Sequence, residues 1–97
     1  MIYITDDRAR VPKGVIPVPV GRTVVAGLLE TQEFTPCFIG QKAAASVSYL
    51  LNQWMFNTGT GIALALGDIL ITCEILCDNE VPSDVHSEDV QFIMYKV

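Results

Sequence analysis

His86 is the only histidine of the chain, and three carboxylates stand close to it in the sequence, at Asp84, Glu88 and Asp89. One imidazole among carboxylates could bind a metal ion, and a His–Asp pair could act as a general base. Zinc sites use several His or Cys ligands, however, and no second ligand of that kind lies near His86. We therefore interpret this segment as a solvent-exposed loop, and we predict no metal site and no catalytic residue.

Two other short patterns could bind a ligand, and neither is complete. Residues 78–80 (Asp-Asn-Glu) resemble the start of a calcium loop, but Ser83 and Asp89 stand where that loop needs glycine and glutamate. Gly59 and Gly61 lie between a predicted helix and the apolar run that follows it, which is the reverse of the strand-to-helix order in phosphate-binding loops. No serine has a nucleophile-elbow pattern around it. We expect a protein that has no cofactor and is not an enzyme.

The three cysteines, Cys37, Cys73 and Cys77, are predicted to be thiols. An odd number of cysteines in a chain without a secretory signal is typical of a reducing compartment, so we expect a cytoplasmic location. On the strand predicted below, Cys73 and Cys77 would stand roughly 13 Å apart, whereas a disulfide needs Cα atoms within about 7 Å. Their expected role is that of small buried apolar side chains.

Negative charge is concentrated in the later part of the chain. The net charge is −5, and it divides into +2 for residues 1–22 and −7 for residues 23–97. Five acids and no base fall within residues 78–89, namely Asp78, Glu80, Asp84, Glu88 and Asp89. Such a segment either keeps the protein soluble or, together with Glu30 and Glu33, presents carboxylates where a partner expects the phosphates of DNA. The charge argues against direct binding of nucleic acid.

The segment 62–77 predicts a β-hairpin. Two apolar runs, 62–66 and 69–77, flank Gly67-Asp68, a dipeptide that is typical of a two-residue turn. Antiparallel pairing around this turn would place one apolar face in the core. That buried face would include Ile62, Leu64, Ile71 and Cys73.

Residues 23–34 are ambiguous between helix and strand, and we favour a helix. The spacing of Val24, Val25, Leu28 and Leu29 is helical, and Thr23 could cap the first turn. Glu30 and Glu33 would then share the opposite side of the helix.

Residues 41–57 predict a clearer helix, which Thr58-Gly59 would end. One apolar stripe along it comprises Ala43, Val47, Leu50, Leu51 and Trp54. A second surface carries Ala45, Tyr49 and Phe56, and it would face either another element of the chain or a partner.

Strands are predicted at 2–5 and at 90–97, and residues 15–20 are predicted to be extended. Two prolines make this segment either an edge strand or an extended segment without a strand partner. The expected fold class is α+β, with a mostly antiparallel sheet of three to five strands and one or two helices packed on one face. A chain of 97 residues is enough for one domain, 1–97. Its 51% hydrophobic residues and 18% charged residues exclude intrinsic disorder, and no apolar run is long enough to span a membrane.

In length, acidity and absence of catalytic motifs, the whole chain resembles the small acidic proteins that phages encode against host defences. It is most similar in profile to the type I-F anti-CRISPR inhibitors that mimic DNA, and it shares no sequence motif with them. The resemblance implies a non-enzymatic inhibitor in the cytoplasm of the host cell. Its partner would be a basic, nucleic-acid-binding host complex, such as a CRISPR surveillance complex. The expected partner-binding residues are Glu30, Glu33, Asp78, Glu80, Asp84, Glu88 and Asp89.

Two further classes of function are compatible with the sequence. A homo-oligomeric structural or assembly protein of a phage would explain the high apolar content, and the chain is expected to be a monomer or a small homo-oligomer. A small ligand-binding or enzymatic domain would need a pocket that the sequence does not reveal.

Overall fold

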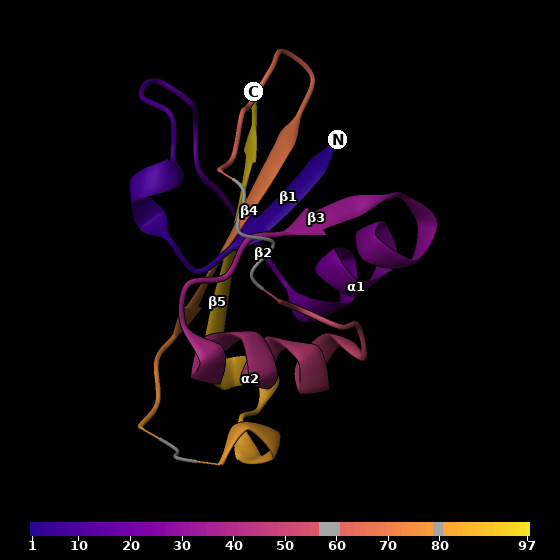
Figure 1. Ribbon diagram of the computed structural model, residues 1–97, viewed down its shortest axis with the longest axis vertical. Helices are drawn as coiled ribbons and strands as arrows, with labels where there is room; N and C mark the ends of the chain where they lie inside the picture. Colours follow the sequence, from indigo (N-terminus) through magenta and orange to yellow (C-terminus); the bar gives the residue numbers. More distant parts are fainter. Residues whose placement is uncertain (57–60, 79–80) are drawn as a thin grey trace.

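The chain folds around a five-stranded sheet with the strand order β2-β5-β4-β1-β3, in a computed structural model that describes residues 1–56, 61–78 and 81–97 (Figure 1). The strands are β1 (Ile2–Thr5), β2 (Val18–Val20), β3 (Phe34–Pro36), β4 (Ile69–Ile75) and β5 (Val90–Lys96). The helices are α1 (Arg22–Thr31) and α2 (Gln41–Leu51), and short 3-10 turns lie at Arg8–Arg10, Pro82–Asp84 and Ser87–Asp89. The predicted α+β class, with helices on a sheet of at most five strands, is confirmed.

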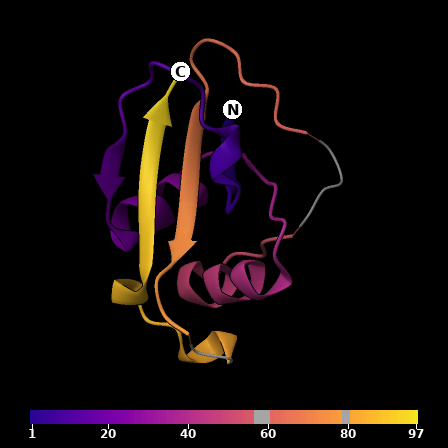
Figure 2. The ribbon, with the colours of Figure 1, turned by 90° about the vertical axis from the view of Figure 1, so that its left-hand side faces the viewer.

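Antiparallel pairing dominates the sheet, although two of its pairs are parallel. The central strand β4 pairs antiparallel with β5 over seven residues, and Figure 2 shows the two strands running side by side in opposite directions. β2 extends β5 in the same manner over three residues. β1 lies on the other side of β4, parallel to it over four residues, and β3 is parallel to β1 over three. The strands predicted near 2–5 and 90–97 are therefore present, and the extended segment 15–20 includes the edge strand β2.

Both helices pack on one face of the sheet. Ile4 of β1, Ile71 of β4 and Phe92 of β5 point to this face and are at most 2% exposed. Val25 of α1 and Val47 of α2, each fully buried, join them in a single hydrophobic cluster. Alternation along the strands and helical spacing along α1 and α2 thus bring their apolar side chains together.

The other face of β4 is also buried, which explains its nearly continuous apolar sequence. Leu70 and Thr72 point away from the helices and are at most 4% exposed. In Figure 1 the segment 6–17 lies on the opposite side of the strands from α1, and Arg8 of this segment binds Glu74 of β4 with 3.3 Å between nitrogen and oxygen. A strand that is covered on both faces loses the apolar–polar alternation of a half-exposed one.

The predicted hairpin is wrong, and the turn that is present, over residues 65–68, is centred one residue earlier than the predicted one. Residues 62–66 form no strand, Ile62 and Leu64 are only half-buried, and Leu66 is 94% exposed. The turn is closed by a 3.0 Å hydrogen bond from the Asp68 N–H to the Ala65 carbonyl. Gly67 occupies its third position with a φ of +91°, a conformation that favours glycine.

The hairpin fails because other strands already occupy both edges of β4. β1 pairs along one edge and β5 along the other, so no backbone groups of β4 are left for residues 62–66. The predicted burial of Ile71 and Cys73 nevertheless holds, since the side of β4 that faces the core does not depend on which strand pairs with it.

The first helix is confirmed, and its ends differ from the prediction. α1 begins after Gly21, so Thr23 is not its N-cap. It ends at Thr31, which leaves Glu33 outside the helix, in the connection to β3. The strand β3 was not predicted, because its three residues are too few to show a periodicity.

The second helix is confirmed but shorter than predicted. α2 ends at Leu51, and Asn52 follows in the left-handed conformation with a φ of +53°. The Oγ of Ser48 accepts the Met55 N–H at 2.9 Å and so holds the reversed chain against the last turn. Trp54 consequently leaves the predicted apolar stripe and is 77% exposed. The predicted helix end at Thr58-Gly59 falls outside the described residues.

The end of β1 holds the start of α2 in place. The Thr5 hydroxyl donates to the Cys37 carbonyl at 2.7 Å. The Asp6 carboxylate accepts the backbone N–H groups of Ile39 and Gly40 at 2.8 and 2.9 Å. A Cβ on Gly40 would lie 3.1 Å from a carboxylate oxygen of Asp6, so this approach favours glycine. In the described part of the chain, no helix is long and apolar enough to cross a membrane.

Replacing Ile71 by alanine should lower the free energy of unfolding by about 2–5 kcal/mol, because the side chain is fully buried and its removal leaves a cavity. A denaturant titration measures this loss. Leu66→Ala is the matched control, since Leu66 lies in solvent, and it should change stability by less than about 0.5 kcal/mol. Equal losses from the two variants would contradict the burial of β4.

Replacing Asp6 by alanine should lower the free energy of unfolding by about 1.5–3 kcal/mol, because two backbone N–H groups lose a charged acceptor. Asp78→Ala removes the same charge from an exposed position and should have little effect. Thermal and denaturant unfolding of both variants test the junction between β1 and α2. If Asp6→Ala were as stable as Asp78→Ala, the junction would not be a structural element.

Candidate functional site

A groove of about 790 Å³ runs along the outer side of α2. Its walls are residues 38–41, which lead into α2, one side of the helix, and residues 52–56, which follow it. We call it the aromatic groove, because its lining includes Phe38, Tyr49, Trp54 and Phe56. A concavity of this size is within the range of small-molecule and peptide sites, so the pocket that the sequence did not reveal is present.

Local backbone interactions shape the aromatic groove. The left-handed Asn52 turns the chain back along α2, and the Phe38 N–H donates to the Phe56 carbonyl at 3.4 Å, which joins the two walls. Asp6 fixes the opposite wall through its hydrogen bonds to Ile39 and Gly40. The groove is therefore built on the main chain and needs no rearrangement to exist.

The apolar side chains around the groove are exposed to solvent. Ile39 and Tyr49 are each 66% exposed, Trp54 is 77% exposed and Phe56 is 46% exposed. Among the described residues, no element buries the second surface predicted for the helix, with Tyr49 and Phe56. Single exposed apolar residues are common on proteins, but apolar side chains that line one groove together make it a candidate binding surface.

The groove offers contacts for binding rather than groups for acid–base chemistry. Of the described residues that line it, Tyr49 is the only one with a titratable side chain. Gln41, Asn52 and Gln53 add amide groups that can donate and accept hydrogen bonds. The lining can therefore bind an apolar or aromatic surface and form a few neutral hydrogen bonds with it.

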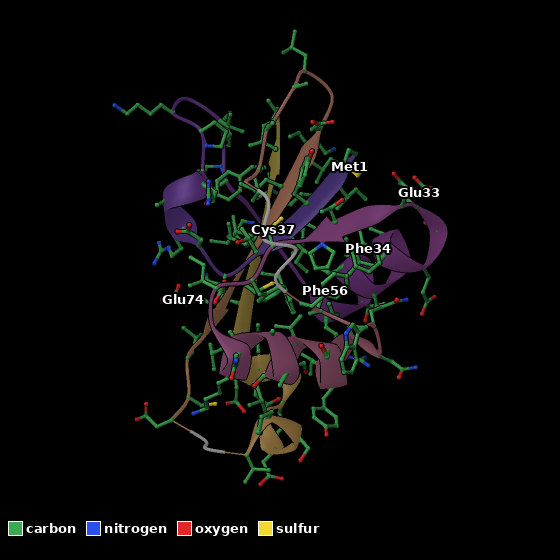
Figure 3. The ribbon with its side chains drawn as sticks, in the orientation of Figure 1. Met1, Glu33, Phe34, Cys37, Phe56 and Glu74 are labelled. Carbon is green, nitrogen blue, oxygen red and sulfur yellow. The ribbon has the colours of Figure 1, made fainter. Side chains whose placement is uncertain are left out.

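The acidic residues that the sequence predicts to bind a partner fall into two separate groups. Asp78, Asp84, Glu88 and Asp89 lie in the segment that follows β4, at the lower end of the molecule in Figure 1, and Glu80 is outside the described residues. Glu33 lies far from them, at the upper right of Figure 3, close to the end of α1 that carries Glu30. The two groups do not form one continuous ridge, because the body of α2 and the lower sheet lie between them.

The acidic segment is anchored to the core by one side chain and capped by another. Val85 is 5% exposed and belongs to the hydrophobic cluster, and the turn Pro82–Asp84 contacts α2. The Asp89 carboxylate accepts the His86 N–H at 3.0 Å and so caps the turn Ser87–Asp89. His86 itself is exposed, and no three His, Cys, Asp or Glu side chains of the described residues are grouped so that they could hold a metal ion.

The cysteines are thiols in different surroundings. Cys73 is buried in the core, and Cys37 and Cys77 are half-buried. Burial raises the pKa of the Cys73 thiol well above its ordinary value, and the negative charge of Asp6 raises it further. The thiolate is the reactive form of cysteine, so Cys73 is an inert core residue, as predicted.

Comparison with known proteins identifies a shared fold and no family. No protein-family model matches the chain, and no curated protein matches it. Among solved structures, the fold is similar to that of B116 of Sulfolobus turreted icosahedral virus (STIV), with a TM-score of 0.69 over 99% of this chain and 98% of that chain. The two sequences are 10% identical, so the likeness concerns the fold alone.

In the native protein, Cys73 should react with a thiol reagent far more slowly than Cys77, because it is buried and its pKa is raised. After unfolding in denaturant without reductant, all three cysteines should react. Mass spectrometry of digested, labelled protein distinguishes the positions. Labelling of Cys73 at the rate of Cys77 in the native state would contradict its burial.

Proposed function

We propose that this protein is a non-enzymatic inhibitor, which binds a basic, nucleic-acid-binding host complex through the acidic segment 78–89. The observation that carries the proposal is the exposure of Asp78, Asp84 and Glu88 at one end of the molecule, on a segment that contains no lysine or arginine. A groove that normally holds the phosphates of DNA is lined by Lys and Arg, and carboxylates held on a folded surface complement it.

The packing of the segment supports this function. Val85 and the capped turn Ser87–Asp89 hold the backbone that carries Asp84 and Glu88 against the protein. A fixed backbone lowers the entropy cost of presenting several charges together to a partner. Glu30 and Glu33 lie on another part of the surface, so they serve long-range attraction rather than direct contact in this proposal.

A viral setting is part of the proposal. The fold that the chain shares with B116 of Sulfolobus turreted icosahedral virus supports it, and so does the short acidic sequence. The proposed host partner is defined by one chemical property, a DNA-binding groove that is lined by Lys and Arg. The specific partner that we propose to test is a type I-F CRISPR surveillance complex.

The second candidate is a homo-oligomeric structural or assembly protein of a phage. The exposed apolar side chains of the aromatic groove favour it, because they provide a surface for self-association. The two candidates differ in where the partner binds, on the acidic segment or on the groove.

The test measures binding to a purified type I-F surveillance complex, and to the DNA-binding proteins of a host lysate, at low and high salt. Binding should weaken steeply with salt and should be displaced by duplex DNA, because both ligands compete for the same cationic groove. If salt has no effect, or if DNA and this protein bind together, the proposed mimicry is wrong.

Two matched double variants locate the contact. Asp78→Lys/Glu88→Lys and Glu30→Lys/Glu33→Lys change the net charge by the same amount on two different parts of the surface. The first should lower the affinity at least about tenfold, since it places like charges against the partner's groove. The second should have a smaller effect that vanishes at high salt. Equal losses from both variants would mean that only the total charge matters.

A further inference from the structure

The aromatic groove is nearly free of charge in a strongly acidic chain. Residues 38–56 contain one charged side chain, Lys42, while the remaining residues together carry −6. Ile39, Tyr49 and Trp54 nonetheless expose about two thirds or more of their surface. We propose that a second copy of this chain covers the groove, so that the protein is a symmetric homodimer whose interface is the aromatic groove.

Charge favours a second copy as the occupant. Two copies that each carry −5 repel one another wherever their acidic surfaces meet, and the groove is a surface on which they can meet without bringing carboxylates together. In a two-fold interface each residue near the axis faces its own counterpart. An uncharged patch can face its own copy without electrostatic repulsion, whereas the acidic segment cannot.

The composition of the patch is that of a protein–protein interface. Tyr, Trp, Phe and Met are enriched in such interfaces and acids are depleted, and the groove contains all four enriched types and no acid. A nucleic acid or an anionic membrane surface would require several bases, and the segment 38–56 contains one. A host complex with a cationic groove would instead select the acidic segment.

The exposed aromatic side chains alone supply a large part of the area that a dimer needs. Aromatic side chains bury about 150–250 Å² each when fully covered, so covering the exposed parts of Tyr49, Trp54 and Phe56 would remove on the order of 300–450 Å² from solvent. A stable interface buries about 800 Å² on each partner. The three aromatic residues would supply about half of this area, and Ile39, which is 66% exposed, would add to it.

The shape of the patch is compatible with self-complementarity. A two-fold interface must contain both a projecting part and the hollow that receives it. Trp54 lines the groove and is 77% exposed, so its side chain projects into solvent. The cavity of about 790 Å³ beside it is the hollow. In the proposed dimer, the Trp54 of each chain enters the groove of the other.

Sedimentation and light scattering over a range of protein concentrations test the oligomeric state. The wild type should approach twice the chain mass of 10.6 kDa and should dissociate on dilution. Because the interface is apolar, raising the salt concentration should not dissociate the dimer. A wild type that stays at 10.6 kDa at every concentration overturns the proposal and leaves the groove to a different occupant.

Trp54 also reports on the interface without any substitution, because it is the only tryptophan of the chain. Its fluorescence should be blue-shifted and protected from acrylamide in the dimer. On dilution it should become solvent-like with the same midpoint as the change in mass. A dimer in which Trp54 fluoresces as a fully exposed indole would use another surface, and the proposal would be wrong.

Trp54→Glu should raise the dimer dissociation constant by at least about 30-fold, since it buries a carboxylate in place of an aromatic anchor on both chains. Leu66→Glu is the matched control, because Leu66 is 94% exposed and does not line the groove, and it should remain dimeric. Circular dichroism verifies the folding of both. A dimeric Trp54→Glu variant overturns the proposal, whatever the outcome of the binding test for the acidic segment.

Discussion

The Asp6 carboxylate accepts backbone N–H groups from Ile39 and Gly40 at the point where the chain leaves the sheet and begins α2. β1 lies between β3 and β4, so its end is the natural neighbour of the chain that emerges from β3. The Thr5 hydroxyl and the Ile4 carbonyl bind the backbone of Cys37 one step earlier. These contacts satisfy backbone groups that no longer have a partner in the sheet and that would be costly to leave unpaired. They also fix the direction of α2, on which the core cluster and the aromatic groove both depend.

Signals that act over a few residues predicted much of this fold. The spacing of Val25 and Leu29 gave α1 correctly, Gly67 was correctly placed in a turn, and the alternation of Phe92 and Met94 with their neighbours gave β5. Long-range pairing was not predictable in the same way. An apolar run such as β4 is compatible with several strand partners, and the strands that pair with it come from the two ends of the chain.

In the candidate site, too, local features were predictable from the sequence and long-range arrangement was not. The exposure of Asp78, Asp84 and Glu88 follows from the polar composition of their segment, and Tyr49 lies on the outer side of its helix, opposite the apolar stripe. Trp54 was assigned to the buried stripe because the apolar spacing continues past Asn52, although asparagine is, after glycine, a common residue for ending a helix in the left-handed conformation. The separation of Glu33 from the acidic segment depends on the strand order, which a single sequence does not specify.

α2 contacts both proposed surfaces, the aromatic groove and the acidic segment, and lies between them. One side of α2 lines the aromatic groove. The turn Pro82–Asp84 of the acidic segment packs against the same helix. The apolar side chains that anchor this arrangement, Val47 and Val85, are both in the core, so neither surface has to contribute its own exposed residues to stability. An apolar contact removes side chains from water and is not screened by salt, whereas exposed carboxylates stay in water and act through charge that salt screens. A partner bound at one surface therefore leaves the other surface unchanged. Pairing two chains through the groove would therefore leave the acidic carboxylates of both copies in solvent, and a dimer could offer two such surfaces to one extended cationic groove.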